Sequence, residues 1–309
     1  MKRKLVKQGA STLMISIPSK WAKQFNLDKG DELEVEENGR SLIMSAEGGK
    51  ALSENSINLS SLTESSIRTG ITNAYRIGYD RIILNFSDRA AFPIIKEVVE
   101  KNLLGFEIIK KTENSCIIEN VTEPAKEQFN NIFSKALMNI DELFVTVEDM
   151  LNGKKIEFED TERNIMKYDA FCRRILLKSG NVGLQPLQWA FHSETMHGQR
   201  ELYFLLRYLS KNKVKVLKET FSLLKETKKI FDTLKEAYDK RSIPLLEKVH
   251  DLEKDIAKQA IRLMEQDKNS LLVHYLFDAA RKFYLAGSPL IGILISETKI
   301  PLELNKKEN

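Results

Sequence analysis

From Pro124 onward, apolar residues recur with the 3.6-residue period of an α-helix. The pattern is clearest over residues 129–147, where apolar side chains form one continuous face that ends at Asn152-Gly153. Further breaks lie at Gly180 and Gly183, Lys211–Lys213, Ser242–Pro244, Asp267–Ser270 and Gly287–Pro289. The breaks predict six helices, three in residues 125–211 and three in residues 212–298. Their similar lengths indicate a duplicated three-helix bundle.

Residues 57–122 show mixed periodicity and predict a small α+β domain in which helices cover one face of a sheet. The expected helices span 61–77 and 90–104, and the expected strands span 81–86, 106–110 and 115–121. Residues 48–60 are polar and predict a linker. The domain contains no histidine and no Gly-rich phosphate loop. Packing and spacing are its expected roles, with sensing of a small ligand as the alternative.

Residues 1–47 predict a separate module that contains a strand, a helical turn and a hairpin. The strand, 13–17, ends at Pro18, the short helix follows over 20–25, and the Asn38-Gly39 turn joins the two strands of the hairpin. A unit this small has too few apolar side chains to close a core without disulfides, metal or a partner. A second copy of the chain is the simplest partner.

Charge is distributed unevenly along this module. Residues 1–27 contain six basic residues and no acid, which gives +6. Residues 28–50 contain three basic and seven acidic residues, which gives 3 − 7 = −4. One basic end and one acidic end give the module an electrostatic direction, and the basic end favours a polyanionic partner.

The module resembles the AbrB/SpoVT swapped-hairpin family. The resemblance rests on the pattern Gly9-x-Ser11-x-x-Met14-Ile15-x-Ile17-Pro18-x-x-Trp21-x-x-x-Phe25-x-Leu27-x-x-Gly30-Asp31-x-Leu33-x-Val35, followed by Leu42-Ile43. It implies two chains that interleave their hairpins and present basic side chains to double-stranded DNA. The implied DNA-binding residues are Arg3, Lys4, Lys7, Ser11, Thr12, Lys20 and Lys23.

Lysines replace the arginines of that family on the short helix. Lysine meets phosphate as a point charge and lacks the planar fork that reads guanine, so we expect more phosphate contacts and less base readout. Two alternatives stay open at this point. The lysines form only a solvated surface, or the module acts as a dimerisation or antitoxin-type clamp.

The helical half resembles PhoU, the regulator of phosphate uptake, chiefly in its architecture. That resemblance implies a surface cluster of divalent or iron ions and a transporter component or sensor protein as a partner. The implied metal ligands are Glu247, Asp251, Asp255, His274 and Asp278. The three acids stand at i, i+4 and i+8, and His274 and Asp278 are one turn apart. A solvated charged face would give the same pattern, and the first bundle lacks it because Ile165 stands four residues before Asp169.

The whole chain of 309 residues is therefore expected to be a multidomain α+β protein. Its N-terminus is basic but precedes no apolar run of signal-peptide length, so a cytoplasmic location without membrane insertion is expected. Cys116 and Cys172 lack partners at metal-ligand spacing and are expected to be structural thiols.

Three functions follow from these features. The leading one is a dimeric regulator of phosphate-related genes whose helical half receives the signal. The alternative is a metal-binding adaptor that regulates a phosphate transporter or sensor without operator recognition. A hydrolase acting on phosphate compounds comes last, because no nucleophile or phosphate-cradling loop accompanies the acids and histidines, and no enzymatic activity is expected.

Overall fold

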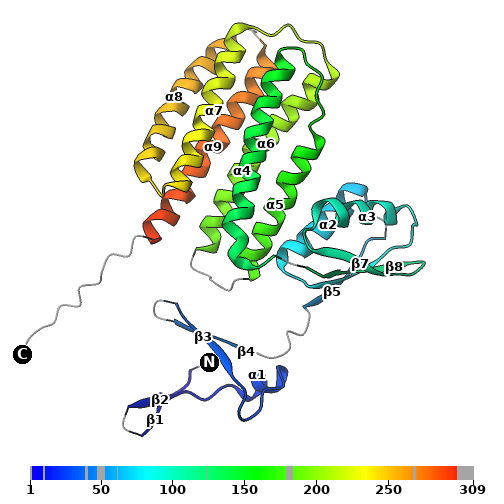
Figure 1. Cartoon of the computed structure of the whole chain (residues 1–309), viewed down its shortest axis with the longest axis vertical. Coiled ribbons are helices and arrows are strands. Elements are labelled where there is room, and N and C mark those ends of the chain that lie inside the picture. Colours follow the sequence, from blue (N-terminus) through cyan, green and yellow to red (C-terminus); the bar gives the residue numbers. More distant parts are fainter. Residues whose placement is uncertain are drawn as a thin grey trace, which may run out of the picture. The chain divides into compact units, whose positions relative to one another are not determined.

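A computed structural model describes residues 2–9, 11–38, 41–46, 53–60, 62–122, 124–178, 184–266 and 269–297 of the chain (Figure 1). The chain divides into two compact units, Met1–Leu52 and Ser53–Asn309. We call them the N-terminal unit and the main unit and describe each by itself. No helix of the described residues contains an apolar stretch long enough to cross a lipid bilayer.

The N-terminal unit contains two hairpins and one short helix. Strands β1 (Val6–Gln8) and β2 (Thr12–Met14) pair antiparallel, as do β3 (Leu33–Asn38) and β4 (Ser41–Ala46), and helix α1 (Ser19–Gln24) lies between the hairpins in sequence. The hairpins form separate two-stranded sheets. This agrees with the expected strand, helical turn and hairpin, and β1 is an addition. Gly39, of the predicted turn, lies outside the described residues.

The main unit begins with a layer of four strands and two helices. The elements follow one another as β5 (Glu54–Asn58), α2 (Glu64–Ile77), β6 (Arg81–Asn85), α3 (Ala91–Asn102), β7 (Phe106–Lys111) and β8 (Ser115–Asn120). The strand order in the sheet is β5-β6-β8-β7, with β5 parallel to β6 and the other pairs antiparallel. Alternate residues of β6 and β8, among them Ile82 and Ile118, are buried in one core with α2 and α3.

The prediction of a linker over residues 48–60 is wrong for its last part, because β5 occupies 54–58. Its side chains are mostly polar because Glu54, Ser56 and Asn58 are exposed, whereas Ile57 packs against the core of the layer. An edge strand needs only this one apolar anchor, since its backbone hydrogen bonds to β6 hold it in the sheet.

Six helices, α4 to α9, form the described part of the helical half after a short 3₁₀ turn, η1 (Lys126–Gln128). Their bounds are α4 Phe129–Leu151, α5 Glu159–Lys178, α6 Gln185–Lys211, α7 Lys218–Asp239, α8 Ile243–Glu265 and α9 Ser270–Glu297. Helix α4 packs on α5 and α6, the three helices α7, α8 and α9 pack on one another, and α6 lies along α9 (Figure 1). Gly180 and Gly183 lie outside the described residues.

The mixed α+β class, with a small β-rich N-terminal region followed by a mostly helical part, is confirmed. The duplication of one three-helix bundle stays a prediction. The predicted break at Gly287–Pro289 is wrong, since α9 continues through Pro289 to Glu297. The residues after the proline, Leu290, Ile293 and Leu294, are buried in the helical core, and this burial outweighs the hydrogen bond that proline removes.

A buried arginine joins the α/β layer to the helical half. Arg174 of α5 is fully buried, and its guanidinium donates to the carboxylate of Asp80 at 2.6 Å and to the backbone carbonyls of Tyr75 and Tyr79. Lys178 donates to the same carboxylate at 2.7 Å. Helices α2 and α3 both contact α5. These contacts hold the α/β layer and α5 together within the main unit.

Candidate nucleic-acid interface

The first hairpin presents polar and basic residues at its turn. Gly9 has φ of 71°, a conformation that suits glycine, and β1 and β2 pair with Lys7 opposite Leu13. Ser11 and Thr12 follow the turn directly, and all three polar side chains are exposed. The hairpin therefore brings Lys7, Ser11 and Thr12 to one exposed end.

Helix α1 begins after Pro18, whose extended backbone ends the preceding segment. Trp21 and Phe25 share a face, with ring centroids 5.3 Å apart. Lys20 and Lys23 are three residues apart and therefore lie within one turn of each other on the helix, and both are exposed. The helix presents two neighbouring cations and keeps its aromatic pair together.

The five basic candidates are all available to a partner. Arg3, Lys4, Lys7, Lys20 and Lys23 are exposed, and none forms an ion pair with a carboxylate whose side chain the structure describes. Lysine and arginine that are not neutralised by acids attract phosphate, and long-range attraction adds to each contact. The predicted DNA-binding residues thus form a set of free cations with two hydroxyl groups.

The same unit leaves its apolar side chains uncovered. None of its side chains whose burial the structure describes is buried. Val35 is 54% exposed and Met44, directly opposite it in the β3–β4 register, is 37% exposed. Residues that face each other across an antiparallel pair lie on the same face of the sheet. The other large apolar side chains left exposed are Leu5, Val6, Leu13, Met14, Ile15, Phe25 and Leu42.

A module of this size with an uncovered apolar face needs another surface to complete its core. Residues 6–50 match the family model of antidote-toxin recognition MazE, a bacterial antitoxin. This region is therefore similar to the swapped-hairpin domains of the MazE/AbrB type. Domains of this type are typically DNA-binding regulators or antitoxins, and they oligomerise. The resemblance to this type of module is confirmed, and all DNA-binding candidates except Arg3 and Lys4 lie in the matched residues.

The match covers the N-terminal unit and leaves the main unit unassigned. No curated protein and no solved structure matches the chain. The resemblance of the helical half to PhoU therefore stays a prediction.

The structure places the predicted metal ligands on two helices without gathering them. Glu247, Asp251 and Asp255 are exposed on α8, and Lys254 and Lys258 approach the two aspartates at 3.8 and 3.7 Å. In the parts of the chain that the structure describes, no group of three or more His, Cys, Asp or Glu side chains is arranged to hold a metal ion. These acids fit a solvated charged face, and a metal cluster stays a prediction.

The other two predicted ligands lie near Glu201, which is outside the predicted set of metal ligands. His274 is exposed on α9 and Asp278 is half-buried. Burial raises the pKa of Glu201 on α6, and the charge of Asp278 raises it further, while His274 opposes the shift. Helix packing thus places Glu201 close to His274 and Asp278, which the spacing of residues along the chain could not show.

A buried ionic network in the helical half was also missed. Asp169 is 1% exposed, and it accepts hydrogen bonds from Arg173 Nε at 2.7 Å and Arg76 at 3.4 Å. His192 Nδ1 lies 3.4 Å from the same carboxylate. Burial lowers the pKa of His192, although the hydrogen bond and charge of Asp169 oppose this shift. The only signal in the sequence was the i, i+4 spacing of Asp169 and Arg173.

Proposed function

We propose that the chain is a DNA-binding transcriptional regulator that acts as a dimer through its N-terminal unit. The observation that carries the proposal is the coincidence, in one swapped-hairpin domain, of five unpaired exposed cations and an uncovered apolar face. A second copy of the chain would cover the apolar face and double the number of exposed cations. Phosphate contacts would then provide most of the affinity, since the set contains one arginine.

The test is a selection of bound duplexes from a random library by the full chain, followed by footprinting. A dimer whose halves are related by two-fold symmetry protects a site with the same symmetry. We expect one protected site with two equivalent halves. Absence of binding to any duplex at low salt would contradict the proposal.

A second candidate function is that of an antitoxin, favoured by the description of the matched family. In that case the N-terminal unit would bind a toxin protein as well as DNA. Co-expression separates the two functions. An antitoxin suppresses the growth arrest caused by its toxin, whereas a regulator without a toxin partner changes only transcription from its operator.

The role of the main unit is a further part of the proposal. We infer that it receives a signal and biases the DNA-binding unit, because a ligand that prefers one conformation of a protein shifts its population. A link to phosphate uptake rests only on the resemblance of the helical half to PhoU. No step of the proposal involves a metal, because the predicted ligands do not assemble in the described residues. The proposed regulator is cytoplasmic and has no enzymatic activity.

Occupancy of the genome in cells grown with high and low phosphate tests the phosphate link apart from DNA binding. Sites clustered at transport genes would support it. Sites at other genes would contradict the link to phosphate uptake but would still support a DNA-binding regulator. An adaptor that acts on a transporter or sensor, the alternative function, predicts no specific site in either condition.

A further inference from the structure

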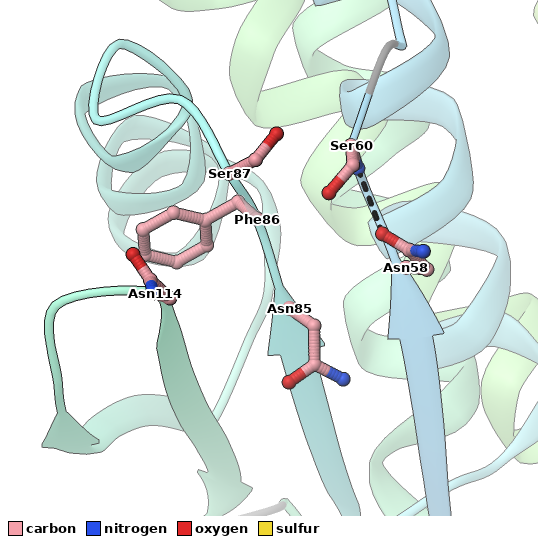
Figure 2. A pocket seen from close by; sticks show the side chains of 6 residues that line it. All are labelled: Asn58, Ser60, Asn85, Phe86, Ser87 and Asn114. Atoms are coloured by element: carbon pink, nitrogen blue, oxygen red, sulfur yellow. Dashed lines mark hydrogen bonds between the residues drawn. The ribbon is translucent and has the colours of Figure 1, made fainter.

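The strongest unassigned feature of the main unit is an open cavity at one end of its sheet. The cavity has a volume of about 470 Å³ and is lined by Asn58, Ser60, Asn85, Phe86, Ser87 and Asn114 (Figure 2). Pockets of roughly 300–1,000 Å³ hold small organic ligands. The cavity belongs to the α/β layer and is independent of the proposed DNA-binding function.

The cavity lies where ligands bind in α/β sheets. Asn58 and Asn85 are the last residues of the parallel strands β5 and β6, and they are direct neighbours in the register. The chain then leads from each strand end into the start of a helix, α2 or α3. In mostly parallel α/β sheets, ligands bind in crevices outside the carboxyl ends of the strands, and this mixed sheet contains one parallel pair, β5 and β6.

Backbone hydrogen bonds fix the residues that line the cavity. Leu59 N donates to Asn85 O at 2.7 Å, which joins the ends of β5 and β6. Phe86 N donates to Asn114 O at 2.9 Å, which joins the end of β6 to the turn between β7 and β8. A site held by regular elements positions its polar groups more accurately than a site built on free loops.

Several polar groups of the lining have no partner in the protein. The side-chain amide of Asn114 and the hydroxyl groups of Ser60 and Ser87 form no hydrogen bond with any other residue that the structure describes. The amide of Asn85, in contrast, donates to Ser56 Oγ at 2.9 Å. Asn58 accepts from Ser60 N through Oδ1 at 3.0 Å, as Figure 2 shows, and its –NH₂ group stays available. The lining thus offers donors and acceptors to a ligand.

The charge around the cavity disfavours an anion. None of its six lining residues is charged. An adjoining cavity, which shares Ser60 and Phe86, includes the acids Glu64 and Asp88. Arg89, the nearest cation in sequence, is paired with Glu113. Thr63 caps the start of α2 by accepting a hydrogen bond from Ser66 N. Asp88 accepts from Ala90 N, just before α3 begins.

We propose that this cavity binds a small uncharged ligand of the nucleobase or nucleoside class. Asparagine presents a donor and an acceptor in one plane and pairs with the edge of a base that offers the complementary groups. Asn58 and Asn114 line the cavity together with two hydroxyl groups, which suit a base and the hydroxyls of its sugar. An uncharged ligand also avoids the repulsion that Glu64 and Asp88 exert on a phosphate.

The test uses the full chain and titration calorimetry with adenosine, guanosine, cytidine and uridine in turn. Asn58→Asp keeps the side-chain oxygen that accepts from Ser60 N and replaces only the –NH₂ group. Asn114→Asp likewise replaces the –NH₂ group of an exposed asparagine. Each change should weaken nucleoside binding about tenfold, the effect of one lost hydrogen bond. Asn164→Asp, an exposed asparagine on α5, is the matched control and should change nothing.

Four results would overturn the inference. The first is that none of the four nucleosides binds at millimolar concentration, and the second is that Asn58→Asp and Asn114→Asp leave nucleoside binding unchanged. The third is that nucleoside monophosphates bind more tightly than the nucleosides. The fourth is that free ribose binds as tightly as the nucleosides. The third would show that the site prefers an anion. The fourth would show that the base makes no contribution.

Discussion

The ion pair between Arg174 and Asp80 allows a quantitative test of how the main unit is held together. Asp80→Ala removes the Asp80 carboxylate from the fully buried guanidinium of Arg174 and from the ammonium group of Lys178. Breaking a buried pair by removing one member costs about 3–5 kcal/mol. The carbonyls of Tyr75 and Tyr79 still accept from Arg174, so we expect the lower end, a loss of about 3 kcal/mol in the free energy of unfolding.

Urea unfolding followed by far-ultraviolet circular dichroism measures this loss, because the main unit contains most of the helix. Glu113→Ala is the control, since it breaks the exposed pair with Arg89 and should have little effect. A loss of less than about 1 kcal/mol for Asp80→Ala would refute the assignment of a structural role to the pair.

The pH dependence of stability in a second variant, Asp80→Asn, gives an independent test. Burial by itself raises the pKa of Asp80, but the hydrogen bond from Lys178 and the charges of Lys178 and Arg174 outweigh it and hold that pKa below its usual value. A carboxyl group with a depressed pKa stabilises the fold above its unfolded pKa of about 3.9 and loses this effect as pH falls. The difference in stability between the wild type and Asp80→Asn should therefore shrink as pH falls below about 4.

Three further predictions concern packing and reactivity. Val35→Asp should shift the protein toward the monomer in analytical ultracentrifugation, because it places a charge on the uncovered apolar face. A dimer that this change leaves intact would show that the interface lies elsewhere. Gly198→Ala should destabilise the fold by about 1–3 kcal/mol, because the added Cβ would lie 2.6 Å from the ring of Phe283. Gly70→Ala is the control and should stabilise its helix, because nothing lies within 4 Å of the added Cβ. Cys116 should resist alkylation at neutral pH until the protein unfolds, since burial raises the pKa of its thiol to about 11.

Periodicity and capping signals predicted most of the helices. The segments from α4 to α9 each have an apolar face, and the predicted breaks other than Gly287–Pro289 lie between observed helices or at their ends. Helices α5 and α7 begin several residues after the predicted breaks, at Glu159 and Lys218. The break predicted at Pro289 was wrong because local sequence cannot show that Leu290, Ile293 and Leu294 are buried in the folded protein. Strand β5 was not predicted because few of its side chains are apolar. Its stability comes from pairing with β6, which is distant in the chain.

The candidate DNA-binding residues were predictable because a charge imbalance is visible in a short stretch of sequence. The ionic networks were not, since Arg174 and Asp80 are 94 residues apart, and Arg76 and Asp169 are 93 apart. The cavity of the α/β layer was hidden in the same way. Its lining comes from three strand ends that only the sheet brings together.

The central claim is that the free cations of the N-terminal unit bind phosphate in a dimer. Five cations per chain give twice five, or ten, possible contacts in a dimer, and 6–10 contacts predict that log affinity falls with log salt at a slope of about −5 to −9. Fluorescence anisotropy of the full chain on labelled duplex DNA, over a range of salt concentrations, measures this slope. Lys20→Gln with Lys23→Gln removes four contacts from the dimer and should make the slope shallower by about 3.6, whereas Lys135→Gln on α4 should leave it unchanged. A wild-type slope near zero, or a slope that the paired substitution leaves unchanged, would contradict the account.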